Sequence, residues 1–141
     1  MTAAFMTARY VWVQTGIPPK CKLPKWRKDA LKAKADEFIE AFYKPTILKP
    51  PPKEPRFNYV VDFHAKWHGA YLKFIACFAC PQPNAVLPFF EHAFARLGYF
   101  RDDAWSLWAR RHNEEWIVLG HQMTLEDCFE RMRSDPWFHV S

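Results

Sequence analysis

The alternation of apolar and polar residues across two neighbouring segments constrains the fold of this chain more than any other feature. Residues 58–67 and 70–79 each alternate with a period of two, and His68 and Gly69 lie between them. Glycine readily adopts the positive φ that a two-residue hairpin turn needs, so we predict two antiparallel strands joined at His68 and Gly69. The register set by this turn gives one entirely apolar face, with the pairs Trp67–Ala70, Ala65–Leu72, Phe63–Phe74, Val61–Ala76 and Tyr59–Phe78. We therefore predict that this face lies in the core.

The same hairpin contains two histidines and two cysteines in the order His64-x3-His68-x8-Cys77-x2-Cys80, a spacing that suggests zinc. The predicted register pairs His64 with Lys73 and Cys77 with Val60, which separates the His64 and Cys77 side chains by about 13 Å at ~3.3 Å per residue. Cys77 and Cys80 point to opposite faces if the strand continues, and His68 lies in the turn. Zinc needs its ligands within about 2.3 Å of one point. We therefore predict no metal site, and buried structural thiols.

Helices are predicted at both ends of the domain. In residues 25–43 the apolar side chains Leu31, Ala35, Phe38 and Phe42 recur at helical spacing, and Pro45 is expected to end the helix. The proline-rich residues 45–55 are then an extended connector. In the C-terminal helix, Thr124 is the expected N-cap and Asp127 is at N3, and the predicted buried stripe consists of Leu125, Cys128, Phe129 and Met132.

Three further strands are predicted between the hairpin and the last helix. They are FFEHAFARLGYF, AWSLWARR and EEWIVL, with tight turns at Asp102-Asp103 and Asn113-Glu114. The facing pairs are then Phe100–Trp105, Gly98–Leu107, Arg111–Trp116 and Ala109–Val118. Residues 89–97 also fit a helical period, but we favour a strand. The expected fold is α+β: an antiparallel sheet of about five strands, with an N-terminal and a C-terminal helix packed on one side and the N-terminal segment partly covering the other.

A basic segment precedes this domain. Residues 1–28 contain no acidic residue but carry six cations: Arg9, Lys20, Lys22, Lys25, Arg27 and Lys28. We expect residues 1–24 to form a basic arm with a possible short strand at 10–13, and residues 25–141 to form a single α+β domain. A basic arm on a nearly neutral domain is typical of contact with nucleic-acid phosphates or an acidic partner, although it could simply add solubility.

Composition indicates the compartment. The chain has four scattered cysteines, which favours the reducing cytoplasm over a disulfide-bonded secreted protein. No apolar run approaches the ~20 residues that a membrane-spanning helix needs, so we expect no membrane contact. The N-terminal segment lacks the pattern of a secretory signal, and an organelle transit peptide is the remaining alternative.

Several stretches together are similar to a known family. They are a leading helix followed by KPPPKEPRFNYVVD, the AKW strand, FARLGYF with WSLWARRHNEEW, and the closing TLEDCFERMRSDPWF. Over about residues 30–138 this order resembles a family of small uncharacterised bacterial domains of unknown function. The resemblance implies an α+β fold with an antiparallel sheet between terminal helices. It implies no activity and no catalytic residues.

The sequence contains neither a Gly-rich phosphate loop nor a G-x-S-x-G nucleophile motif, and we assign no catalytic residue and no cofactor. We expect a non-enzymatic binding module, a small accessory subunit of a nucleoprotein assembly. It would contact RNA or single-stranded DNA through the basic arm and through a sheet face formed by His64, Lys66, Tyr71 and Lys73.

Two other functions remain open at this point. One is an adaptor in a larger protein complex without nucleic-acid contact, because Trp, Phe and Arg are the usual anchors of protein interfaces. The other is a hydrolase-like enzyme that uses His112 or His64. Arg110, Arg111, Glu114 and Glu115 surround His112 in the sequence, but charged residues in a turn are usually there for solvation.

Overall fold

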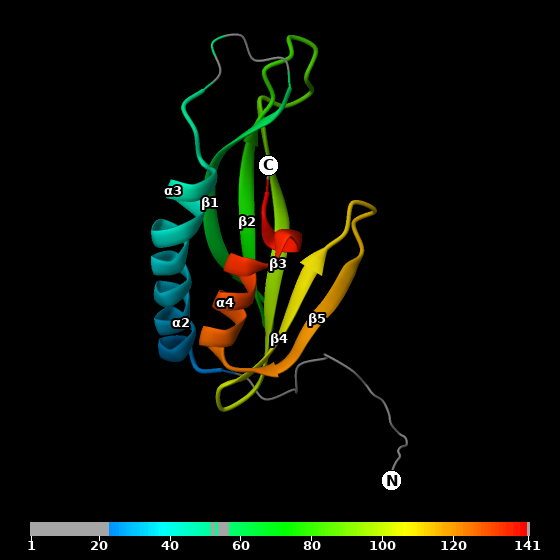
Figure 1. Ribbon diagram of the computed structural model, residues 1–141. Helices are drawn as coiled ribbons and strands as arrows, with labels where there is room; N and C mark the ends of the chain where they lie inside the picture. Colours follow the sequence, from blue (N-terminus) through cyan, green and yellow to red (C-terminus); the bar gives the residue numbers. More distant parts are fainter. Residues whose placement is uncertain (1–22, 52, 54–56, 141) are drawn as a thin grey trace.

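The computed structural model describes residues 23–51, 53 and 57–140, which form one antiparallel sheet with helical segments before and after it. The five strands follow one another in space as they do in the chain: β1 (Tyr59–His68), β2 (Tyr71–Ala79), β3 (Phe89–Arg101), β4 (Ala104–Arg110) and β5 (Trp116–Met123). The helices α2 (Lys25–Phe38) and α4 (Leu125–Ser134) lie on the same face of the sheet (Figure 1). The predicted α+β fold is confirmed. The short strand predicted at 10–13 lies outside the described residues.

The N-terminal helical segment is longer than predicted. After α2 the chain makes a π-helical turn (Ile39–Tyr43) and continues as α3 (Lys44–Ile47), so the predicted end at Pro45 is wrong. Pro45 lies in the first turn of α3, and the wider turn before it accommodates a residue that has no N–H to donate. The π-helical turn also rotates the buried stripe. Ile39 and Tyr43 enter the core, and Phe42 is only partly buried.

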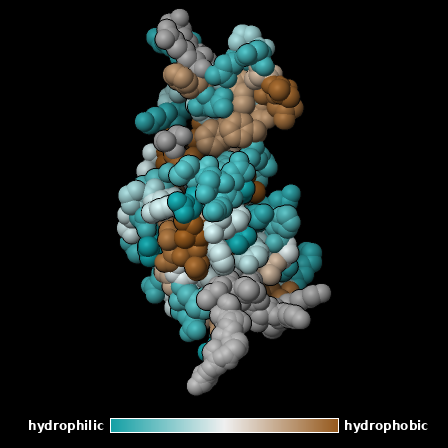
Figure 2. Space-filling model, turned by 90° about the vertical axis from the view of Figure 1, so that its right-hand side faces the viewer, coloured by the Kyte–Doolittle hydropathy of each residue, from teal (hydrophilic) through white to brown (hydrophobic). Residues whose placement is uncertain are grey.

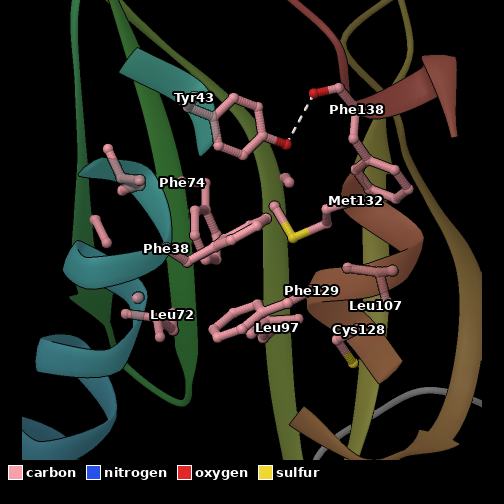
Figure 3. Packing of buried hydrophobic residues seen from close by; sticks show 14 of the residues in the cluster. Phe38, Tyr43, Leu72, Phe74, Leu97, Leu107, Cys128, Phe129, Met132 and Phe138 are labelled. Carbon is pink, nitrogen blue, oxygen red and sulfur yellow. Dashed lines mark hydrogen bonds between the residues drawn. The ribbon is translucent and has the colours of Figure 1, made fainter. Parts of the chain in front are cut away.

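The predicted N-cap and buried stripe of the C-terminal helix are both confirmed. The Thr124 hydroxyl accepts a hydrogen bond from the backbone N–H of Asp127 at 3.1 Å. The predicted stripe of Leu125, Cys128, Phe129 and Met132 is buried. Beyond α4, the 3₁₀ turn η2 (Pro136–Phe138) brings Phe138 into the core, where its carbonyl accepts a hydrogen bond from the Tyr43 hydroxyl at 2.9 Å (Figure 3). This bond joins the ends of the two helical segments.

The core lies between the helices and one face of the sheet. The rings of Phe38 in α2 and Phe129 in α4 are stacked with centroids 4.5 Å apart, and each meets the ring of Phe74 edge-on at 6.3 Å (Figure 3). Phe74 is fully buried on β2. One aromatic side chain from the sheet therefore contacts both helices, as expected for a core in which aromatic area dominates.

The β1–β2 hairpin forms, but its predicted pairs are wrong by two residues. Its turn consists of Gly69 and Ala70, and His68 pairs with Tyr71. Gly69 has φ of +61°, and a turn with positive φ at its first central residue needs glycine there, which moves the turn by one position. A shift of two residues keeps every side chain on its predicted face. The core face therefore holds Phe63, Ala65, Leu72, Phe74 and Ala76 as predicted.

The predicted faces are wrong at one place in the hairpin, where β1 has a bulge. The register changes between Val60 and Asp62, so Val60 is buried and the predicted core residue Val61 is exposed. A bulge places an extra residue in one strand and reverses the faces beyond it. The predicted pairing of the end of the hairpin was therefore wrong.

In the rest of the sheet, too, the strands are predicted correctly but their residue pairs are shifted. Residues 89–97 are part of strand β3, which confirms the strand over the helix, and the turn at Asp102-Asp103 is confirmed. The predicted pairs in β3–β4 are wrong by one residue, because the register changes between Tyr99 and Arg101: the structure pairs Tyr99–Trp105 and Leu97–Leu107. The predicted Asn113-Glu114 turn is a longer loop over residues 111–115, so the β4–β5 pairs are Arg110–Trp116 and Ala109–Ile117.

Replacement of Phe74 by alanine tests the assignment of the two faces. We expect Phe74→Ala to lower the free energy of unfolding by about 3–5 kcal/mol, because it opens a cavity between both helices and the sheet. The measurement is urea denaturation. The control is Lys66→Ala on the opposite face of the same hairpin, which should change stability by no more than about 0.5 kcal/mol. Equal losses in the two variants would contradict the assignment.

Candidate functional site

The face of the sheet that points away from α2 and α4, here called the outer face, carries the polar residues that the sequence singled out. His64, Lys66, Tyr71 and Lys73 all lie on it, as the alternation of β1 and β2 predicted. The pairing Lys73–Arg96–Trp108 extends this face across β3 and β4, and the pair Arg110–Trp116 extends it to β5. The sequence interpretation missed Arg96, Trp108 and Trp116, because the bulges change which residues share a face.

Arg96 is the centre of an aromatic cluster on this face. Its guanidinium carbon lies 4.0 Å from the ring centroid of Tyr71 and 4.5 Å from those of Trp108 and Trp116. A planar guanidinium stacks favourably on such rings. Burial is the main cause that lowers the pKa of Arg96 below its usual value. The cluster fixes the positive charge of Arg96 in place and uses ring surface of Tyr71, which the sequence had suggested for base stacking.

Three nitrogen atoms in this cluster lack acceptors. The Nε atoms of Arg96 and Arg110 and the Nε1 atom of Trp108 are buried and have no hydrogen-bond partner in the described structure. A buried donor without an acceptor costs about 1–3 kcal/mol. Neighbouring side chains cover these three donors, so they are a cost of packing the cluster and are not accessible to a ligand.

Beside the cluster, the outer face is hollowed. The hollow has a volume of about 280 Å³ and is lined by Lys66, His68, Lys73, Ile75, Glu91, Ala93 and Arg110. Lys66, Lys73 and Arg96 form no ion pair with any carboxylate in the described part of the chain. The pKa of Lys73 is lowered, first by burial and then by the positive charges of Arg96 and Arg110. Within the described residues, Lys66, Lys73 and Arg96 therefore lack a paired carboxylate, whereas Arg110 pairs with Glu114 at 3.3 Å.

At the edge of the hollow, three different side chains from three neighbouring strands meet. The Cys77 Sγ atom lies 3.6 Å from His64 Nδ1 and 3.8 Å from Glu91 Oε2, and His64 Nε2 lies 3.6 Å from the same carboxylate oxygen. The predicted separation of about 13 Å between His64 and Cys77 is therefore wrong. The corrected register pairs Cys77 with Asp62, which makes His64 its diagonal neighbour on the same face.

This trio is not arranged as an activated nucleophile. Burial, followed by the negative charges of Glu91 and Asp62, raises the pKa of the Cys77 thiol above its usual value. A nucleophilic cysteine needs the opposite, a lowered pKa that favours the thiolate. The sulfur of Cys77 is therefore not activated as a nucleophile.

The predicted cations of the N-terminal segment divide into two groups. Arg9, Lys20 and Lys22 lie outside the described residues. Lys25 pairs with Asp29 on the surface of α2 at 3.0 Å. The side chains of Arg27 and Lys28 donate to the backbone carbonyls of Asp102 and Gly69, respectively, at 2.6 and 3.2 Å. Arg27 and Lys28 therefore hold the start of α2 against the turns at one end of the sheet.

The histidine of the β4–β5 loop gains no catalytic partner. His112 is exposed in the loop over residues 111–115, and its side chain makes no ion pair or hydrogen bond with another described residue. Glu114 instead pairs with Arg110 at 3.3 Å, and Asn113 stabilises the loop by accepting from the backbone N–H of Glu115. These charged residues pair with one another in an exposed loop, which is consistent with a role in solvation.

Comparisons with known proteins give one match. The family model described as Domain of unknown function (DUF3024) matches residues 23–139. No curated protein and no solved structure matches the chain. Within residues 23–51, 53 and 57–140, no helix combines the length and the apolar character needed to cross a membrane.

Removal of the guanidinium tests the aromatic cluster. We expect Arg96→Ala to lower the free energy of unfolding by about 1–2 kcal/mol, because its contacts with three rings are lost. Tryptophan emission should also move to longer wavelength as water reaches Trp108 and Trp116. Arg111→Ala, which removes the same charge from an exposed position, is the control for stability and fluorescence. An Arg96 variant that matches this control in both measurements would contradict the role of the cluster.

Proposed function

The chain belongs to the family of the domain of unknown function DUF3024, and from this premise we propose that it is a non-enzymatic module that binds RNA or single-stranded DNA. We propose further that it serves as a small accessory subunit of a nucleoprotein assembly. The outer face makes the phosphate contacts, and the basic N-terminal segment adds to them. The observation that carries this proposal is the excess of positive charge around the hollow, where Lys66, Lys73 and Arg96 form no ion pair with a described carboxylate.

A phosphate backbone supplies negative charge to a face on which cations outnumber carboxylates. Lys66, His68, Lys73 and Arg110 line the hollow with a single carboxylate among them, that of Glu91. A phosphodiester brings one negative charge per nucleotide and several acceptor oxygens, and contacts from Lys and Arg to such oxygens are charge-assisted.

The same residues support binding that depends weakly on nucleotide sequence. The guanidinium of Arg96 lies over the rings of Tyr71, Trp108 and Trp116, so these rings hold a cation in place. We expect the cations of this face to meet phosphate oxygens, which carry no base information. Affinity then comes from charge, with stacking on the remaining ring surface as an addition.

A protein adaptor is the second candidate, and one observation favours it. Val86, Leu87 and Phe89 are 97%, 61% and 61% exposed at the end of the sheet where the β2–β3 loop lies. Figure 2 shows apolar side chains gathered at this end of the molecule. Exposed apolar clusters are typical of protein interfaces. A hydrolase that uses His112 or His64 has less support, because His112 is solvated and the thiol beside His64 is not activated.

We also propose a cytoplasmic location. Cys77, Cys80 and Cys128, the cysteines within the described residues, are all free thiols. Free thiols are typical of proteins in a reducing compartment.

Removal of two cations from the hollow tests the binding face. We expect the double variant Lys66→Ala, Lys73→Ala to bind a labelled single-stranded oligonucleotide more weakly than the unchanged chain. The slope of log K against log[salt] should also become shallower by about 1.4–1.8, at 0.7–0.9 per lost phosphate contact. The measurement is fluorescence anisotropy over a series of salt concentrations, with RNA and with single-stranded DNA.

The matched control for this experiment is Lys34→Ala, Lys49→Ala. It removes the same charge from exposed positions outside the outer face and should leave the slope unchanged. Equal effects of the two double variants would show that only net charge matters. No binding at low salt would contradict the nucleic-acid proposal and leave the adaptor.

Deletion of residues 1–22 tests the basic segment separately. The deletion removes Arg9, Lys20 and Lys22 and keeps Lys25, Arg27 and Lys28. We expect the salt slope to become shallower by up to about 2–3, from the loss of three possible phosphate contacts. Because the described core lies in residues 31–138, the melting temperature should change little. An unchanged slope would assign all phosphate contacts to the sheet.

A further inference from the structure

We infer that His64, Cys77 and Glu91 form a binding site for a divalent transition-metal ion, zinc in the first place. These three residues offer one ligand atom each, and the three atoms lie within 4.8 Å of one another. The inference rests on their positions and does not depend on nucleic-acid binding. It also differs from the tetrad that the spacing of the histidines and cysteines suggests, because it replaces His68 and Cys80 by Glu91.

The distances approach those of a tetrahedral metal site, with the sulfur near one imidazole nitrogen and the carboxylate near the other. Zinc binds sulfur at about 2.3 Å and nitrogen or oxygen at about 2.0–2.2 Å, which puts its ligand atoms roughly 3.3–3.6 Å apart. The Sγ–Nδ1, Sγ–Oε2 and Nε2–Oε2 distances of the trio are 3.6, 3.8 and 3.6 Å. Small rotations of these side chains bring one imidazole nitrogen, the sulfur and the carboxylate around one point.

The fold builds this arrangement with a bulge. From Tyr71 to Phe74, β2 pairs with β3 so that Lys73 faces Arg96, and the same register continued would place His92 opposite Cys77. The register changes between Phe74 and Ile75, so Cys77 instead faces Glu91. The extra residue is Phe94, whose ring is buried against Tyr43 and Phe63 in the core. The packing of Phe94 therefore keeps Glu91 on the face that holds Cys77 and His64.

The donor set selects the kind of metal. A thiolate and an imidazole favour zinc and similar transition metals over magnesium and calcium, which prefer oxygen ligands alone. Three protein ligands on a solvent-accessible sheet face leave a fourth position for water or an exogenous ligand. His68 and Cys80 do not complete the set. His68 contacts Lys73 at the other end of the hairpin, and Cys80 follows the end of β2 on the opposite parity to Cys77.

A metal also changes the charge of the hollow. Bound zinc displaces the thiol proton, so the dication is balanced by the Cys77 thiolate and the Glu91 carboxylate. Glu91 is the acidic residue that lines the hollow. Once it ligates a cation, the positive charges of Lys66 and Lys73 are no longer opposed by the carboxylate of Glu91, while Arg110 keeps its ion pair with Glu114.

Cobalt substitution tests the site in the full chain, produced without a histidine tag. Titration of the reduced protein with Co²⁺ should give a saturable thiolate-to-metal absorption band at one ion per chain, with visible bands of tetrahedral intensity. Zinc should displace the cobalt and raise the melting temperature. Cys77→Ser should abolish the thiolate band. His64→Gln and Glu91→Gln should each weaken the affinity by at least about tenfold, since even the loss of an outer-shell partner costs 10–100-fold.

The matched controls are Cys80→Ser and His68→Gln, the two residues that the motif would use and the trio does not. Both should bind cobalt as the unchanged chain does. Loss of the band in Cys80→Ser, or unchanged affinity in Glu91→Gln, would overturn the trio as the ligand set. The absence of any stoichiometric band in the unchanged chain would overturn the site itself.

Discussion

The strict alternation of side chains across a single sheet, with helices on only one side of it, is the constraint on which the structure depends. Phe74 on the core face contacts Phe38 and Phe129 and so holds α2 and α4 to the same surface. The residues that alternate with the core residues along each strand then point to the outer face. An antiparallel meander tolerates such a two-sided sheet because one face can be solvated. In this chain the outer face holds cations, aromatic rings and potential metal ligands. The packing of the core thus determines which residues are available for binding.

Bulges determine where the side chains of a strand switch from one face of the sheet to the other. The irregularity in β1 exchanges Val60 and Val61 between the two faces. The one in β3 turns Phe94 into the core and Glu91 outward. Each adds a single residue to one strand, yet each changes the neighbours of every residue beyond it. Bulges are frequent next to functional sites because they redirect side chains in this way. Here, the trio of His64, Cys77 and Glu91 exists because a bulge in β3 lies between the aromatic cluster and the trio.

The strengths and limits of the sequence prediction follow from the same physics. Three features were predicted correctly from periodicity and capping residues: the class of the fold, the strand over residues 89–97 and the buried stripe of α4. All three depend on local sequence pattern. The pairing of individual strands was wrong in the hairpin by two residues and in β3–β4 by one. A turn position or a bulge costs little energy locally, and the packing of distant side chains such as Tyr43 decides it. The prediction that His64, Lys66, Tyr71 and Lys73 share one face was correct, because a shift of two residues leaves each side chain on the same face of the sheet. The proximity of His64 to Cys77, and the place of Glu91 beside them, did not follow from the sequence because both depend on register.

The cations of the outer face are placed by two different mechanisms, and this difference bears on their roles. Arg96 is held by three rings, and its position is part of the fold. Among the described residues, Lys66 and Lys73 form an ion pair with no carboxylate, and the Lys73 Nζ atom lies 3.3 Å from Nδ1 of another basic side chain, His68. Charges with fixed positions orient a ligand, whereas mobile, unpaired charges mainly attract it. Arg96 and its aromatic neighbours therefore form the rigid part of the proposed interface. The lysines around the hollow supply attraction that depends on salt, and the trio at its edge controls whether Glu91 opposes them.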